Sequence, residues 1–207
     1  MGKTSVKAIE ARLASRGASS VVCTWNVDEY REAARCLVGP SDVVLEIGCC
    51  GGMTTSVIHE QCRYVVGVDK NEGEIENARR RFGDLSDRIR FEVADAFDIG
   101  KALQMQRQVP GGKFNVVFID INGSRSLSTV WEVMQAYEKT IMPETIIVKS
   151  VHLNTLLLRS TAFQSEATKR MIHRLKANNS KVRSPVVIVV GLGLGCLAAA
   201  FSYLRQP

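Results

Sequence analysis

The stretch that decides the fold runs Val43-Val44-Leu45-Glu46-Ile47-Gly48-Cys49-Cys50-Gly51-Gly52 and continues into Met53-Thr54-Thr55. Its apolar part predicts a buried strand, and its glycines predict a turn into a helix opened by the two threonines. Because glycine has no Cβ, such a turn lets the backbone approach a ligand closely. The carboxylate of Glu46 would repel a bare phosphate. We therefore expect a ligand with hydroxyl or amino groups, such as a nucleoside joined to a cationic amino acid.

Short apolar runs alternate with amphipathic segments through the middle of the chain. The pattern predicts strands at 64–69, 89–93, 114–119 and 145–148, and helices at 72–82 and 126–142. Strands separated by helices indicate right-handed βαβ units. The fold class predicted is α/β and Rossmann-like, with a mostly parallel twisted sheet and helices on both of its faces.

Ionisable residues stand at the ends of five successive predicted strands, namely Glu46, Asp69, Asp95, Asp120 and Lys149. The carboxyl ends of parallel strands line the crevice where open α/β folds bind ligands. Solvated loop charges would explain any one of these residues, but they explain the ordered set poorly. Asp69 has the spacing of a carboxylate that accepts both ribose hydroxyls. A nicotinamide dinucleotide site would also place an acid there, but its G-x-G-x-x-G fingerprint is missing from the loop.

From about residue 42 to residue 150, these ordered motifs resemble the class I S-adenosylmethionine (SAM)-dependent methyltransferases. The resemblance implies SAM as the cofactor, with the loop of residues 46–52 around its methionine part. It implies that Asp69, with Lys70 beside it, binds the ribose and that Asp95 and Ala96 face the adenine. It also places Asp120 beside the transferable methyl group. The full set of cofactor-binding residues so implied is Glu46, Gly48, Cys49, Cys50, Gly51, Thr54, Asp69, Lys70, Asp95, Ala96 and Asp120.

Within that superfamily the chain is similar to the fibrillarin-type RNA 2′-O-methyltransferases. The similarity lies in the loop at 48–55, in Phe118-Ile119-Asp120 and in Ile147-Val148-Lys149-Ser150. It implies RNA as a partner and Asp120 and Lys149 as catalytic residues. A ribose hydroxyl is a poor nucleophile, so a lysine whose ammonium form is disfavoured by burial and by the sulfonium could act as its base. A solvated strand-end charge is the alternative interpretation of Lys149.

Two departures bear on this assignment. The fibrillarin-like sites have a further lysine before the first strand, where this chain offers only Arg31 and Arg35. Arginine can hold a phosphate but cannot act as a base. The end of the fifth strand lacks the Asp-Asn pair of metal-dependent catechol-type enzymes, so we expect no metal.

Composition sets only broad bounds on partners and compartment. The 207 residues suit a single domain, and 27 Lys and Arg against 21 Asp and Glu give a net charge of +6, which is compatible with an anionic partner such as RNA. Basic residues gather at 79–90 and at 169–183, where an RNA track and a solvated helix face are equally supported. The six cysteines form no C-x-x-C pair, which favours a reducing compartment, in the cytoplasm or nucleus.

The two ends of the chain are the least specific parts. The predicted domain spans 1–207, with an N-terminal helical extension at 1–40, the core motifs at 41–150 and a C-terminal helix and hairpin at 151–207. An organellar import peptide is the alternative for the first residues. Val186 to Leu204 contains no charge and would suit a membrane tail. We favour an antiparallel hairpin there, because the sheet would otherwise lack its last strands.

The function predicted is therefore methyl transfer from SAM to an RNA oxygen, of the ribose 2′-hydroxyl type. A methyltransferase for a small molecule or a protein is one alternative. A catalytically silent scaffold with the SAM fold, tail-anchored in a membrane or not, is the other. Nothing in the sequence predicts the oligomeric state.

Overall fold

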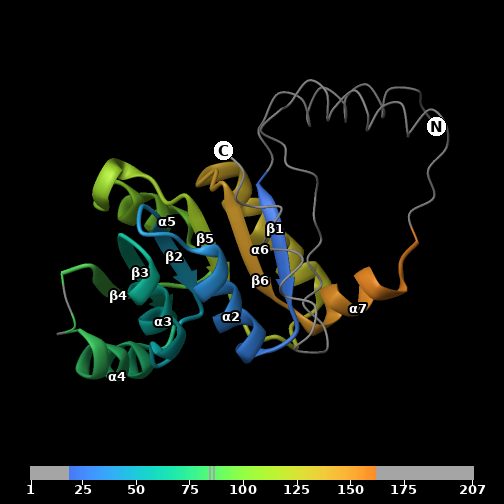
Figure 1. The fold of residues 1–207 in the computed structure, drawn as a ribbon, viewed down its shortest axis with the longest axis horizontal. Helices are drawn as coiled ribbons and strands as arrows, with labels where there is room; N and C mark the ends of the chain where they lie inside the picture. The colour runs from blue at the N-terminus through green and yellow to red at the C-terminus, as the bar shows by residue number, and fades with distance from the viewer. Residues whose placement is uncertain (1–18, 84, 86, 162–207) are drawn as a thin grey trace.

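The computed structural model describes residues 19–83, 85 and 87–161, and within them the strands form one parallel sheet (Figure 1). The sheet has six strands in the order β1-β6-β5-β2-β3-β4, and every pairing is parallel. The strands are β1 Ser20–Thr24, β2 Val43–Ile47, β3 Tyr64–Asp69, β4 Ile89–Val93, β5 Val116–Ile119 and β6 Thr145–Lys149. The Rossmann-like α/β fold is thus confirmed.

The helices connect these strands and cover both faces of the sheet. They are α2 Val27–Leu37, α3 Met53–Gln61, α4 Glu72–Phe82, α5 Ile99–Gln106, α6 Leu127–Thr140 and α7 Val151–Arg159, with a short turn η1 at Pro110–Gly112. The first three pack with Val44, Val65 and Phe118 in one core cluster. The other three pack with Leu45, Val66 and Ile119 in a second cluster. Successive strand residues point to opposite faces, so a continuous apolar run such as β2 is buried on both sides.

Most of these helices begin at a polar residue that follows a strand. The side chains of Asn26, Asn71, Asp98, Ser126 and Ser150 each accept a hydrogen bond from a backbone N–H in the first helical turn. Such caps fix the direction in which the chain leaves the sheet. The exception is α3, which starts at a glycine with positive φ and has no side-chain cap. Its start is set by the glycine loop instead.

Strand β1 was not predicted, because residues 1–40 were expected to form a helical extension. Val21, Val22 and Cys23 are too few to predict a strand by themselves. They become one by pairing in parallel with β6, from Ser20 opposite Thr145 to Thr24 opposite Lys149.

Several expectations concern parts of the chain outside the described residues. They are the helix in the first eighteen residues, the hairpin and membrane tail proposed for Val186 to Leu204, and the basic group at 169–183. Among the residues that are described, no helix combines the length and apolar character needed to cross a membrane.

The turn after β2 lies against the end of β5. The Asp120 N–H donates to the Ile47 carbonyl at 2.8 Å, which continues the pairing of the two strands by one residue. Gly48 has φ +82°, and a Cβ on this residue would lie 1.9 Å from the Asp120 carbonyl oxygen. Only glycine allows both this backbone conformation and this approach.

We expect Gly48→Ala to lower the free energy of unfolding by on the order of 3 kcal/mol or more, because it adds a backbone clash to a left-handed conformation. Gly111→Ala is the matched control. That glycine has φ +77°, and a Cβ added to it would meet nothing within 4 Å, so the variant should lose only about 1 kcal/mol. Urea denaturation of the two variants measures the difference, and equal losses would show that the clash contributes nothing.

Candidate functional site

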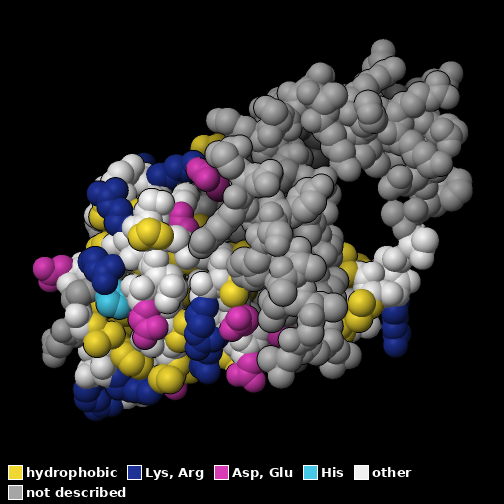
Figure 2. Space-filling model, in the orientation of Figure 1, with side chains coloured by type: hydrophobic (Ala, Val, Ile, Leu, Met, Phe, Trp, Pro, Cys, Tyr) yellow, Lys and Arg dark blue, Asp and Glu magenta, His cyan; other side chains and the backbone are white. Residues whose placement is uncertain are grey.

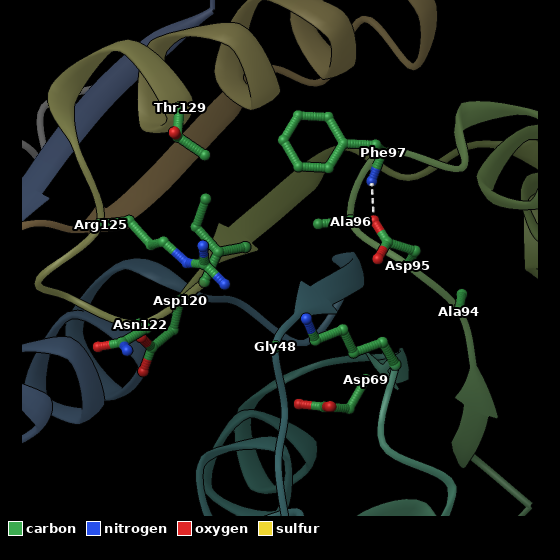
Figure 3. A pocket seen from close by; sticks show the side chains of 12 residues that line it. Gly48, Asp69, Ala94, Asp95, Ala96, Phe97, Asp120, Asn122, Arg125 and Thr129 are labelled. Carbon is green, nitrogen blue, oxygen red and sulfur yellow. Dashed lines mark hydrogen bonds between the residues drawn. The ribbon is translucent and has the colours of Figure 1, made fainter.

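A cavity of about 480 Å³ opens at the carboxyl ends of β3, β4 and β5 (Figure 3). Six of its lining residues were predicted as site residues: Gly48, Asp69, Lys70, Asp95, Ala96 and Asp120. Six others were not predicted: Ala94, Phe97, Ile121, Asn122, Arg125 and Thr129. The first group follows the strand ends, which the sequence pattern reveals. The second comes largely from the loop after β5 and the start of α6, whose place over the cavity depends on the fold.

Asp69, the last residue of β3, is oriented by two backbone groups. Its Oδ2 accepts from the Cys50 N–H at 3.0 Å and its Oδ1 accepts from the Asn71 N–H at 2.9 Å. The first bond ties the glycine loop to β3, and the second closes the turn into α4. Each carboxylate oxygen retains a lone pair, so Asp69 can still accept two hydroxyl hydrogens from a ribose.

Asp95 stands two residues after β4 on the opposite wall. Its Oδ1 accepts from the Phe97 N–H at 2.9 Å (Figure 3), and its side chain is otherwise exposed. The second oxygen is therefore free to accept from an exocyclic amine. Together with Asp69 and the close backbone approach at Gly48, this donor and acceptor set fits an adenosine.

Asp120 and Lys149 form an ion pair at the ends of two adjacent strands. Lys149 Nζ lies 2.5 Å from Asp120 Oδ2, and each side chain is only 18% exposed. Asp120 is among the residues that line the cavity, and Lys149 is not. The loop between β5 and α6 passes over the lysine, since a Cβ on Gly123 would lie 3.4 Å from Lys149 Cε. The two residues predicted as catalytic are thus in direct contact.

Glu46 lies inside β2 instead of at its end, and its side chain turns away from the cavity toward α3. It is 1% exposed and accepts from Thr55 Oγ1 at 2.5 Å. Burial raises the pKa of Glu46 to about 8, and Asp120 contributes to the increase, while Thr55, Arg31 and Lys149 oppose it. The carboxyl therefore keeps its proton at neutral pH.

The other predicted loop residues surround the turn without lining the cavity. The Cys49 side chain is 5% exposed, and burial raises the pKa of its thiol. Cys50 and Gly51 lie outside the cavity. Thr54 is also buried, and it accepts a hydrogen bond from Arg31 Nε at 3.3 Å. Within the described part of the chain, no three His, Cys, Asp or Glu side chains are grouped to hold a metal ion.

Tyr30 of α2 is a buried neighbour of this region that the sequence did not single out. Its ring is fully buried and packs edge-on against Phe118 with centroids 5.2 Å apart. Its hydroxyl has no hydrogen-bond partner among the described residues. Burial raises the pKa of Tyr30 well above its ordinary value, and the nearby carboxyls of Glu46 and Asp120 add to this. The only sequence signal was its position on the apolar face of α2.

The basic group at 79–90 is largely occupied by contacts within the protein. Arg79 donates twice to the Phe91 carbonyl, at 3.0 and 2.7 Å, and Arg90 pairs with Glu92 at 2.8 Å. Arg88 donates to a backbone carbonyl at the end of α3. On the face shown in Figure 2, basic side chains alternate with acidic and apolar ones. Arg79, Arg88 and Arg90 thus have partners within the protein, at the edge of the sheet formed by β4.

The buried Glu46 predicts a specific pH dependence of stability. Its carboxyl keeps a proton in the folded state up to about pH 8, whereas the unfolded chain loses it near 4.5. The folded state binds more protons between these values, so the stability that this proton contributes is full at low pH and decreases as the pH rises through the window. The slope is up to about 1.4 kcal/mol per pH unit.

Glu46→Gln should remove this slope, because glutamine is neutral at every pH and still accepts from Thr55. Relative to the unchanged protein, the variant should gain roughly 2 kcal/mol or more between pH 5 and pH 8 in urea denaturation. Parallel pH profiles for the two proteins would contradict a protonated Glu46.

Comparisons with known proteins bear on the identity of this region. The family model described as a methyltransferase domain matches residues 44–122, which run from β2 to the loop after β5. No curated protein matches the chain.

Among solved structures, the N-methyltransferase NodS from Bradyrhizobium japonicum is 15% identical, with a TM-score of 0.46 and coverage of 71% of this chain and 80% of that one. An rRNA methylase from Streptococcus thermophilus is 10% identical, with a TM-score of 0.45 and coverage of 63% and 75%. The YcgJ protein from Bacillus subtilis is 17% identical, with a TM-score of 0.36, and the alignment covers 44% of this chain and only 37% of YcgJ. Similarities with such low identities and TM-scores do not indicate which reaction this chain catalyses.

The matched family region contains the glycine loop and the three carboxylates that line the cavity. The family match supports SAM as the cofactor, which is what the motifs predicted. Residues 44–122 match the family model of a methyltransferase domain, and they lie within the Rossmann-like fold of the parallel sheet.

Proposed function

We propose that the chain transfers the methyl group of SAM to an oxygen of RNA, at a ribose 2′-hydroxyl. The observation that carries this proposal is the Asp120–Lys149 ion pair, with Nζ and Oδ2 2.5 Å apart and both side chains mostly buried. A basic side chain in direct contact with a cavity-lining carboxylate provides what an unactivated hydroxyl needs. Similarity of the loop and of these two strand ends to the fibrillarin-type enzymes supports the choice of ribose.

The residues that would hold the cofactor come from three strand ends, those of β2, β3 and β4. Asp69 would accept the ribose hydroxyls, Asp95 would accept the adenine amine, and Gly48 would allow the backbone to pass close to the sulfur. Bound in this way, SAM supplies an electrophilic methyl group on a positively charged sulfonium. The position of Asp120 in the lining favours placing that methyl group next to the ion pair.

The protein's own contribution to the reaction is to accept a proton. Lys149 Nζ is the basic atom in contact with the cavity-lining carboxylate of Asp120. The substrate hydroxyl then loses its proton to Lys149 Nζ as its oxygen forms the new bond to the methyl carbon. The electron pair of the broken carbon–sulfur bond stays on sulfur. After transfer, the ammonium of Lys149 is held against Asp120 Oδ2.

The reaction is tested with methyl-labelled SAM and total cellular RNA, protein and metabolite fractions. We expect label in RNA, recovered after nuclease digestion as 2′-O-methyl nucleosides. Label confined to protein or to metabolites would contradict the RNA substrate, and label on a base would contradict the ribose oxygen.

Lys149→Met should reduce turnover at least about 100-fold, since general base catalysis contributes 10²- to 10⁴-fold, and should leave SAM affinity within about twofold by calorimetry. Asp69→Ala is the opposite control and should lose SAM binding. Lys113→Met removes an exposed lysine at the other end of β5 and should change neither property. Retained turnover in Lys149→Met would rule out its role as base.

A further inference from the structure

Two side chains at the mouth of the cavity have no role in the function proposed so far. Phe97 follows Ala96 on the β4 side, and its side chain is 50% exposed. Arg125 comes from the loop that precedes α6 and is also exposed. Figure 3 shows the ring and the guanidinium pointing from opposite sides toward the space between them, and both residues line the cavity.

The backbone that carries Arg125 is well anchored. Its N–H donates to the Asn122 carbonyl at 2.9 Å, and the Val151 N–H donates to the Gly123 carbonyl at 3.2 Å. The Asn122 side chain accepts from the Ser124 hydroxyl at 2.9 Å. The guanidinium itself has no hydrogen-bond or ion-pair partner among the described residues. The backbone of Arg125 is thus held in place, while the N–H donors of its guanidinium have no partner among the described residues.

The charge balance of the cavity indicates what this guanidinium would bind. Asp69 and Asp95 are engaged by backbone N–H groups and suit the neutral hydroxyls and amine of an adenosine. Asp120 is paired with Lys149. Within the described structure, none of these three carboxylates is paired with the guanidinium of Arg125. An anionic group that arrives with the substrate would supply the partner that this guanidinium lacks.

The exposed ring of Phe97 indicates a second property of the same substrate. The Phe97 N–H donates a hydrogen bond to the Asp95 carboxylate. This bond holds the backbone of Phe97, and the ring projects over the cavity. An aromatic ring presented in this way offers a stacking surface for a planar base. A ligand that stacks on Phe97 and pairs with Arg125 must carry a planar ring and a negative charge. A nucleotide has both.

We propose that Arg125 binds a phosphodiester next to the target nucleotide and that Phe97 stacks on an adjacent base of the same RNA strand. This inference rests on the proposed function and names the two residues that would hold its substrate. In this proposal the RNA strand binds at the mouth of the cavity and not at the arginines of residues 79–90.

The test is binding of a fluorescein-labelled, mixed-sequence single-stranded RNA of twelve nucleotides to the full chain saturated with S-adenosylhomocysteine. Arg125→Ala should weaken binding about tenfold and reduce the slope of log affinity against log salt by about 0.7, the value for one phosphate contact on a single strand. Phe97→Ala should also weaken binding about tenfold, by loss of stacking, with the salt slope unchanged. Both variants should bind S-adenosylhomocysteine within about twofold of the unchanged protein.

Two matched controls accompany these variants. Arg107→Ala removes an exposed arginine at the far end of α5, and Trp131→Ala removes an aromatic side chain that is 54% exposed on α6 outside the cavity lining. Neither should change RNA affinity. Adenosine monophosphate and a single-stranded DNA of the same sequence are the competitors, and we expect both to compete more weakly than RNA.

Each contrary result has a distinct meaning. An equal loss of affinity for RNA and for S-adenosylhomocysteine in Arg125→Ala or in Phe97→Ala would assign that side chain to the cofactor and overturn the inference. If adenosine monophosphate competes as well as RNA does, the ligand of these two residues is a free nucleotide and not a polynucleotide. If both variants keep their RNA affinity, Arg125 and Phe97 do not bind the substrate. Because binding is measured without turnover, the absence of methyl transfer to RNA would refute the proposed function and leave the binding result to be judged separately.

Discussion

The rest of the site depends on the contact between the turn after β2 and the end of β5. Gly48 has no side chain, so its backbone lies directly against the carbonyl of Asp120. This contact joins the glycine loop to the residue that carries the carboxylate of the ion pair. Asp69 holds the same loop from the other side through the Cys50 N–H. The loop is therefore fixed between β3 and β5, and the cavity has its shape before any ligand arrives.

The same framework separates the strand-end carboxyls into groups with different chemistry. Glu46 is enclosed between the sheet and α3, where burial raises its pKa to about 8 and keeps it neutral. Asp69 and Asp95 are held by backbone N–H groups and remain open to a ligand. Asp120 is the one in contact with a cation, Lys149. A neutral acid below the loop lets the charged pair lie close by without a second carboxylate repelling it.

Local pattern was sufficient for the parts of this protein whose structure depends on nearby residues. The helix predicted at 72–82 has the same bounds as α4, and the strand ends gave the positions of Asp69, Asp95 and Asp120. Contacts between distant segments were not visible in the same way. The five residues of β1 form a strand only beside β6. Glu46 was expected to face the ligand, yet a side chain in the middle of a central strand points to one of two covered faces, and here it meets Thr55. Arg125 gave no signal, because its place over the cavity is set by the path of one loop.

That loop also connects substrate binding to the chemistry. It leaves β5 at Asp120, passes Lys149 at Gly123 and then presents Arg125. Lys149 is bounded on its other side by β1, where Thr24 is its partner in the sheet and the Ser150 N–H donates to the Thr24 carbonyl at 3.0 Å. These contacts hold the backbone of Lys149 between β1 and the end of β5. A strand held by Arg125 would be held by the same segment that fixes the base, so a substrate atom brought within reach of one is placed at a defined distance from the other. Positioning of this kind removes much of the entropic cost of a reaction between two separate molecules. In the proposed reaction it would help Lys149 to act on a nucleophile as weak as a ribose hydroxyl.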